Sequence, residues 1–251
     1  MKKMKLLIMA HLGLAIILAG CKCKTCAEPI SYLVKFSFQN KVGADQLQFN
    51  TTYTNPHGEP FTVTSFKYYI SHISFTTDAG VETDVPDSYF LVDEKTAASK
   101  TFTVSVAGNK FSKINFYVGV DSTRNVSGVQ TGALDPANGM FWTWNSGYIM
   151  AKLEGVSPVS TSPLNGITYH IGGFKTGENV VNKITISLPA PLNISTARPS
   201  EIMLNADVNA WFRGSADVKI ATNSFCMNPG AVAMKIAANY MRMFTVTSVI
   251  N

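Results

Sequence analysis

The segment Tyr32-Leu-Val-Lys-Phe-Ser-Phe38 carries large apolar residues at every second position. Successive side chains of a β-strand point to opposite faces, so this period predicts a strand with one face in a core. Similar short runs, rich in β-branched and aromatic residues and separated by Gly, Pro, Asn or Asp, recur along the chain. They cover residues 47–53, 62–75, 89–92, 101–106, 113–120, 148–155, 167–174, 182–188, 201–212 and 244–250. The pattern predicts an all-β fold, an antiparallel β-sandwich or barrel-like single domain.

One short helix is expected near the C-terminus. Val232, Ile236 and Tyr240 are spaced by four residues, with alanines beside them. This spacing puts them on one helical face. Asn228 is a suitable N-cap, and Pro229 suits a first helical turn.

The N-terminus has the pattern of a lipoprotein signal. Three lysines precede an apolar run over residues 6–18, and Leu18-Ala-Gly-Cys21 follows. The run is too short for a membrane span. We therefore expect a signal peptide over 1–20, lipidation of Cys21, a tether over 21–28 and one domain over 29–251. The alternative is a plain secreted protein that begins at a cysteine. Lipidation predicts a cell-envelope protein anchored to a membrane, on a periplasmic or outer-membrane face.

Net charge and cysteine content limit the partners and the metal or thiol sites that we expect. The whole chain carries +5, and loss of the three signal lysines leaves +2 on the mature protein. A nearly neutral domain gives no reason to expect a nucleic-acid partner. Cys23 and Cys26 form a CxxC pair that is either a soft-metal or thiol-exchange site or an incidental feature of the tether, and we favour the latter. Cys226 is expected to be a small buried apolar residue.

Known catalytic motifs are absent: there is no GxSxG, HExxH, P-loop or GxGxxG pattern. We therefore expect a binding protein rather than an enzyme. After signal cleavage the histidines are His57, His72 and His170, and no two have metal-site spacing in sequence. Any metal site must be assembled across strands. Taken alone, His57 indicates an exposed turn, and His72 and His170 indicate strand residues.

The segment Gly139-Met-Phe-Trp-Thr-Trp-Asn-Ser-Gly-Tyr148 contains two of the three tryptophans, Trp142 and Trp144. In extended backbone they share a face, and turn-forming residues bracket the segment. Two indoles on one face either fill a core or form an oxidisable wall beside a ligand.

This segment is followed by Lys152-Leu-Glu-Gly155 and Tyr169-His-Ile-Gly-Gly173, and Phe66-Lys-Tyr-Tyr-Ile-Ser-His72 precedes it. In this order the elements resemble the methanobactin-associated periplasmic protein family, the MbnP-like copper-binding domain. The resemblance implies a β-rich envelope protein that binds Cu(I). It also implies a site of histidines and a tryptophan that a partner dihaem peroxidase oxidises to kynurenine.

The chain departs from the family pattern at two places. Residues 121–128, Asp-Ser-Thr-Arg-Asn-Val-Ser-Gly, lack the histidine that many relatives carry there, and the segment after His170 lacks a cysteine. His170 is thus the family-matched metal candidate, with His72 and His57 as further nitrogen donors. Met140, Met150, Met227 and Cys226 are soft donors that suit Cu(I). Of the two tryptophans we favour Trp142 for oxidation, because Trp144 lies nearer the Asn-Ser-Gly bend.

Two functions follow from these residues. The first is a copper-binding lipoprotein in which the tryptophans and His170 line the site. The second is a lipid-anchored β-sandwich that has lost the metal site and serves as a structural module or binds a small ligand or glycan.

Overall fold

β1 (Ser31–Val42) lies at the centre of the smaller of two large sheets. The computed structural model describes residues 30–143 and 147–251. β1 pairs in parallel with β14 (Ser200–Asp207) and antiparallel with β7 (Thr101–Ala107) and β2 (Asp45–Gln46). β16 (Phe244–Ile250) adds to the far side of β14. The alternation predicted from Tyr32 to Phe38 is confirmed, since Val34, Phe36 and Phe38 are buried.

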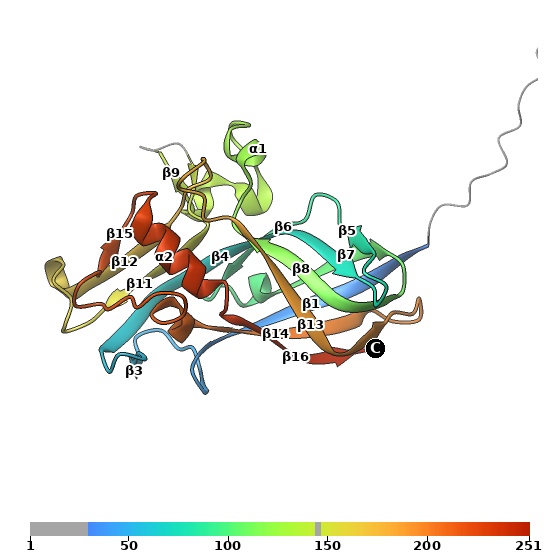
Figure 1. Cartoon of the computed structure of the whole chain (residues 1–251), viewed down its shortest axis with the longest axis horizontal. Helices are drawn as coiled ribbons and strands as arrows, with labels where there is room; N and C mark the ends of the chain where they lie inside the picture. The colour runs from blue at the N-terminus through green and yellow to red at the C-terminus, as the bar shows by residue number, and fades with distance from the viewer. Residues whose placement is uncertain (1–29, 144–146) are drawn as a thin grey trace, which may run out of the picture.

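β4 (Pro60–Thr76) organises the larger sheet (Figure 1). Its hydrogen-bonded order is β13 (Asn182–Asn193), β8 (Lys110–Val118), β4, β11 (Ala151–Val156), β12 (Gly166–Ile171) and β15 (Phe225–Cys226). Three short strands also pair with β4, namely β3 (Thr52–Thr54), β5 (Glu82–Asp84) and β6 (Tyr89–Asp93). Seventeen residues let β4 pair with different strands along its length.

Aromatic side chains join the two sheets. Phe38 of the smaller sheet lies 6.1 Å, centroid to centroid, from Tyr68 of the larger one, and Phe244 lies 5.1 Å from Phe116. Phe36 contacts Phe75 in the same way. These rings bury large apolar areas and favour edge-to-face geometry. The two sheets therefore form a sandwich, and neither closes into a barrel.

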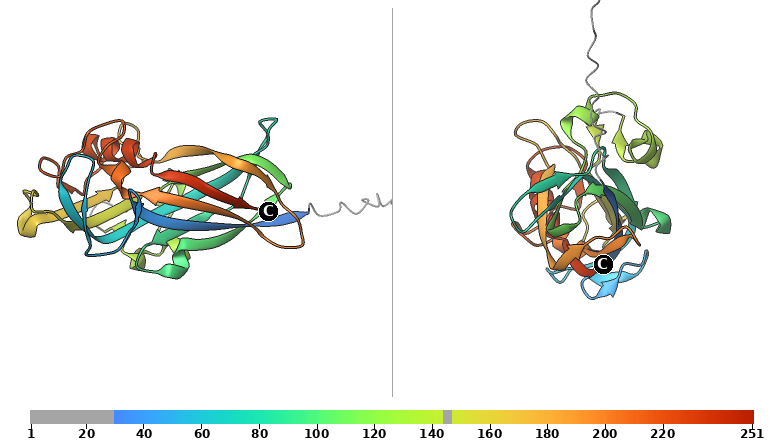
Figure 2. Two further views of the ribbon diagram at one scale, coloured as in Figure 1. Left: turned by 90° about the horizontal axis from the view of Figure 1, so that it is seen from below. Right: turned by 90° about the vertical axis from the view of Figure 1, so that its right-hand side faces the viewer.

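The two ends of the sandwich differ. β1 begins, and the C-terminal strand β16 ends, at the right of Figure 1. β12, β15 and the helix α2 (Ala231–Tyr240) lie at the other end, as Figure 1 and the left panel of Figure 2 show. The candidate residues around position 170 are therefore remote from the start of the domain.

Short helices connect the strands. They are α1 (Ser122–Asn125) and five 3₁₀ turns, η1 (Ala97–Lys100), η2 (Gly132–Leu134), η3 (Pro136–Asn138), η4 (Pro163–Asn165) and η5 (Val208–Trp211). A two-stranded hairpin, β9 (Phe141–Trp142) and β10 (Gly147–Tyr148), completes the described fold. No helix among the described residues is long and apolar enough to cross a bilayer.

The expected all-β sandwich with a C-terminal helix is confirmed, but the sheets are mixed rather than purely antiparallel, because β1 with β14 and β12 with β15 pair in parallel. Three further details are wrong. Residues 47–53 do not form one strand, because Asn50 adopts a left-handed backbone (φ 64°) and the Tyr53 hydroxyl accepts the backbone N–H of Gln48. Residues 201–212 are not all strand, because the strand ends at Asp207. The Asp207 side chain accepts the N–H of Asn209 and caps η5.

The third error concerns the start of the C-terminal helix. Gly230, not Asn228, occupies the N-cap, and Pro229 lies outside the helix. α2 buries Ile236 and Tyr240 as predicted, whereas Val232 is 37 % exposed. Gly230 has a φ of 133°, a backbone conformation that glycine adopts readily. The expectations for the signal peptide over 1–20, the tether over 21–28, Cys21, Cys23, Cys26 and Trp144 concern residues outside the described ranges.

Candidate functional site

Trp142 is fixed against the edge of β12. It pairs with Gly147 across the β9–β10 hairpin and is 4 % exposed. A Cβ atom added to Gly172 would lie 2.5 Å from its Cζ3 atom. The indole thus occupies the space that a side chain at position 172 would need. Position 172 lies two residues after His170, which places the indole near that histidine.

Two lysines hold the turn that leads into this hairpin. Lys152 Nζ donates to the carbonyl of Gly139 at 2.7 Å, and Lys67 Nζ donates to that of Asn138 at 3.2 Å. The predicted turn is confirmed, since the Asp135 carboxylate accepts the N–H of Ala137. Lys67, Lys152 and His170 are register partners across β4, β11 and β12. The hairpin and His170 are therefore tied to the same face of the larger sheet.

His170 has one occupied and one unoccupied ring nitrogen. Nε2 lies 2.6 Å from Glu154 Oε1, and this hydrogen bond from His170 holds the pKa of Glu154 below its ordinary value. An ionised Glu154 can only accept, so Nε2 carries the proton. In the neutral imidazole Nδ1 then presents a lone pair, and this atom is buried without a hydrogen-bond partner among the described residues. Such an orphaned acceptor is uncommon in a folded interior.

Met227 is the soft donor that an extension of the β12–β15 register would set beside His170. β12 and β15 pair in parallel, with Tyr169 opposite Cys226. Continuing this register by one residue sets Met227 beside His170. The chain stays alongside the strand, because a Cβ on Gly173 would lie 3.3 Å from Cβ of Pro229.

Other soft donors are engaged elsewhere. Cys226 is buried, as expected, and burial raises its pKa. Its register partner Tyr169 faces away from His170, because adjacent strand residues alternate between faces. Met150 Sδ accepts the N–H of Val120 at 3.2 Å. Met140 is buried.

The fold does not bring the other histidines to His170. His72 lies on β4 five residues beyond Lys67, roughly 16 Å along the strand at 3.3 Å per residue. His57 lies before β4, in the opposite direction. It is in a turn, as predicted, but the expectation of exposure is wrong, because its side chain is 4 % exposed. Nε2 binds the Phe212 carbonyl at 2.9 Å and Nδ1 contacts Arg213 at 3.1 Å, so both nitrogens are occupied.

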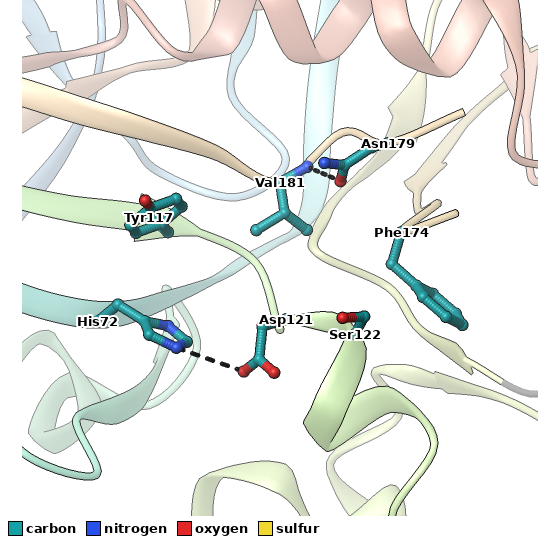
Figure 3. Close-up of a pocket in the computed structure, with 7 residues that line it drawn as sticks. All are labelled: His72, Tyr117, Asp121, Ser122, Phe174, Asn179 and Val181. Carbon is teal, nitrogen blue, oxygen red and sulfur yellow. Dashed lines mark hydrogen bonds and ion pairs between the residues drawn. The ribbon is translucent and has the colours of Figure 1, made fainter. Parts of the chain in front are cut away.

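The environment of His72 was not predicted from sequence. Its Nε2 lies 3.5 Å from Asp121 Oδ2, and both residues line a hollow of about 280 Å³ (Figure 3). Asp121 precedes a Ser-Thr-Arg-Asn stretch, which signals an N-cap, but nothing in the sequence pairs it with a strand 49 residues earlier. Within residues 30–143 and 147–251, no three His, Cys, Asp or Glu side chains gather as a metal-binding group.

Comparisons with known proteins bear on this arrangement. The family model described as MbnP matches residues 31–228. A solved structure, "MbnP from Methylosinus trichosporium", aligns with a TM-score of 0.49 and 12 % identity, over 86 % of this chain and 98 % of that chain. A search of curated proteins gave no match. Because the family model spans most of the sequence, including the Trp142 hairpin and His170, the chain belongs to the MbnP family.

Proposed function

We propose that this protein is a lipid-anchored cell-envelope member of the MbnP family that binds Cu(I), with His170 as a ligand. The observation that carries the proposal is the state of the His170 imidazole. Its Nε2–H is bound by the Glu154 carboxylate, and its Nδ1 lone pair is buried without a partner among the described residues.

This is the arrangement that metal-binding histidines use. Such a histidine usually donates its second ring N–H to a carboxylate, which fixes the tautomer and raises the basicity of the other nitrogen. Cu(I) is soft and is bound by imidazole and thioether groups. His170 Nδ1 would therefore hold the ion, Met227 is the second donor that the strand register favours, and Glu154 would orient the imidazole. His72 and His57 would lie outside this site.

The remaining parts of the proposal come from sequence and family. Lipidation of Cys21 would anchor the protein to a membrane. A dihaem peroxidase is the partner that would oxidise Trp142, whose indole packs at Gly172 near His170. That chemistry would belong to the partner enzyme.

The test is copper analysis of full-length protein purified from its native host. We expect about one Cu(I) per chain by family analogy, measured by metal analysis and by anaerobic competition with a chromophoric Cu(I) chelator. His170→Ala should reduce affinity most, and Met227→Leu should reduce it less. His57→Ala is the matched control, because both nitrogens of His57 are already occupied. Peptide mass spectrometry should show a gain of about 4 Da at Trp142 if it is kynurenine.

Copper-free protein from the host, together with unchanged affinity in His170→Ala, would reject the copper proposal. The second function, a module that binds a small organic ligand, would then stand. The hollow beside His72 supports this second function, because it is separate from His170.

A further inference from the structure

The hollow at His72 lies where β4, β8, α1 and the segment before β13 meet. Figure 3 shows His72 and Tyr117 on one side of it and Phe174 on the other, with Asp121 between them. It measures about 280 Å³, enough for a small organic molecule. It is lined by His72, Tyr117, Asp121, Ser122, Phe174, Asn179 and Val181.

His72 is held in this hollow by an irregularity of β4. The register between β4 and β8 shifts between Ser71 and Ser74, which marks a β-bulge. His72 has a positive φ of 49°, which is uncommon outside glycine and asparagine. Its backbone N–H is bound by the carbonyl of Ser88 at 3.0 Å. Bulges of this kind re-aim a side chain, and here the imidazole is fixed before any ligand arrives.

The hydrogen-bond network leaves two acceptors facing each other. Ser71 Oγ donates to the carbonyl of Gly119 at 2.7 Å, so it accepts from His72 Nδ1 at 3.2 Å. The neutral imidazole then presents the Nε2 lone pair towards Asp121 Oδ2, 3.5 Å away. The Tyr89 hydroxyl is bound to the same carboxylate oxygen. That hydroxyl also lies 3.4 Å from Nε2, and its single proton cannot serve both acceptors, so the pair is short of one donor.

The carboxylate side of this pair is charged. Burial raises the pKa of Asp121, but lowering effects, chiefly the hydrogen bonds from the Tyr89 hydroxyl and the backbone N–H of Arg124, outweigh it, and the pKa lies below its ordinary value. Asp121 thus remains an anion at neutral pH.

The surroundings add further negative charge. A second hollow on the other side of His72 contains Glu82, Asp84 and Asp87. Lys183 pairs with Glu82, and Arg124 pairs with Asp87. No ion pair involving Asp84 occurs among the described residues, so the side of His72 next to Asp84 and Asp121 keeps an excess of anions that favours a cationic group there. The nearest cation on the opposite wall is Lys175, whose Nζ lies 6.0 Å from the Phe174 ring centroid.

The walls of the hollow are apolar and aromatic. Tyr117 packs edge-to-face on His72 at 5.5 Å, and Phe174 and Val181 lie across the opening. Aromatic faces attract cations and also cover apolar groups. Such walls suit a ligand with a short apolar body attached to its charged end.

We propose that this hollow binds a small primary ammonium ion with a short apolar body. The ammonium group would donate hydrogen bonds to His72 Nε2 and Asp121 Oδ2, and the body would lie between Tyr117 and Phe174. The proposal does not depend on copper binding, because the pair at His72 is remote from His170.

The test is isothermal titration calorimetry on copper-free full-length protein with three probes of similar shape. Phenethylamine has the charge and the N–H donors, 2-phenylethanol lacks the charge, and the N-trimethyl derivative of phenethylamine lacks the donors. We expect phenethylamine to bind at least tenfold more tightly than either of the others, the effect of losing one charge-assisted hydrogen bond.

Variants identify the site. His72→Asn removes the imidazole but tolerates the positive φ, and Phe174→Leu removes an aromatic wall without touching the polar pair. His72→Asn should weaken phenethylamine binding at least tenfold, and Phe174→Leu should weaken it at least threefold. His170→Asn should leave phenethylamine binding unchanged. Equal affinity for the amine and the alcohol, no binding of the amine, or unchanged affinity in His72→Asn and Phe174→Leu would overturn the proposal.

Discussion

The indole of Trp142 lies against Gly172 so closely that an added methyl group would sit 2.5 Å from its ring and 2.9 Å from the Tyr148 carbonyl. Gly172 is therefore required for close packing of the β9–β10 hairpin on β12. We expect Gly172→Ala to destabilise the fold by about 1–3 kcal/mol, the usual cost of overpacking a core.

Urea unfolding followed by tryptophan fluorescence measures this effect. Gly166→Ala, at the first residue of β12, is the control, because the nearest atom to its Cβ would be 3.3 Å away and its φ is −67°. Equal unfolding free energies for the two variants would show that Trp142 does not depend on Gly172.

Gly155 is expected to be still less tolerant. It lies at a register shift between β11 and β4, and a Cβ there would be 1.9 Å from the Thr62 carbonyl oxygen. The obstacle is backbone, which cannot move without breaking the pairing of the two strands. Gly155→Ala should cost about 4 kcal/mol or more and give little folded protein in circular dichroism and soluble-yield measurements. Wild-type stability in this variant would contradict the strand pairing described here.

Glu59 should give the protein a pH-dependent component of stability. Burial raises the pKa of Glu59. Hydrogen bonds from the N–H of Ala221, the Asn55 amide and the N–H of Ile220 lower it by more, so the pKa lies below its ordinary value. A lowered folded-state pKa stabilises the protein above the ordinary titration range, near pH 4.3, and this contribution is lost as the pH falls through the lowered value.

Glu59→Gln tests this directly. It should lower the free energy of unfolding by about 2 kcal/mol at pH 7, the value of hydrogen bonds to a charged group. The difference from wild type should shrink as the pH falls below about 4, where wild-type Glu59 also becomes neutral. A difference that is constant from pH 7 to pH 3 would rule out the carboxylate as its source.

Glu154 should act on metal affinity through His170. Glu154→Gln keeps a hydrogen-bond acceptor for Nε2–H but removes the charge that raises the basicity of Nδ1. We expect Cu(I) affinity to fall about 10- to 100-fold, as for other carboxylates behind a metal-binding histidine. Chelator competition measures it, with Glu201→Gln as the control, since Glu201 pairs with Lys35 on the smaller sheet. Unchanged affinity would remove Glu154 from the site.

Cys21 should decide where the protein is found. Wild type should partition with membranes, whereas Cys21→Ala should remain in soluble envelope fractions or accumulate with its signal uncleaved. Cys226→Ala, at a buried position, should partition like wild type. Fractionation and mass spectrometry of the N-terminal peptide are the measurements. Unlipidated wild-type protein in the medium would contradict the lipoprotein prediction.

Local patterns determined much of the fold. The alternation through Val34 and Phe36, the long apolar run of β4 and the four-residue spacing of Ile236 and Tyr240 all correspond to real elements. These elements were predictable from sequence because burial of one face gives apolar residues a period of two in a strand and 3.6 in a helix. The error at residues 47–53 arose where the burial alternates but Asn50 and the Tyr53 hydroxyl bend the backbone into a turn.

Only the tertiary structure decided which residues form sites. Two strand pairs are parallel, β1 with β14 and β12 with β15, and each joins segments far apart in sequence. Continued by one residue, the second pairing would set Met227 beside His170, and the bulge in β4 turns His72 towards Asp121. Strand order, register and bulges depend on packing across the whole core, so no local pattern encodes them. The sequence by itself determined the β-sandwich and its candidate histidines, whereas long-range strand pairing separated those histidines and gave each its partner.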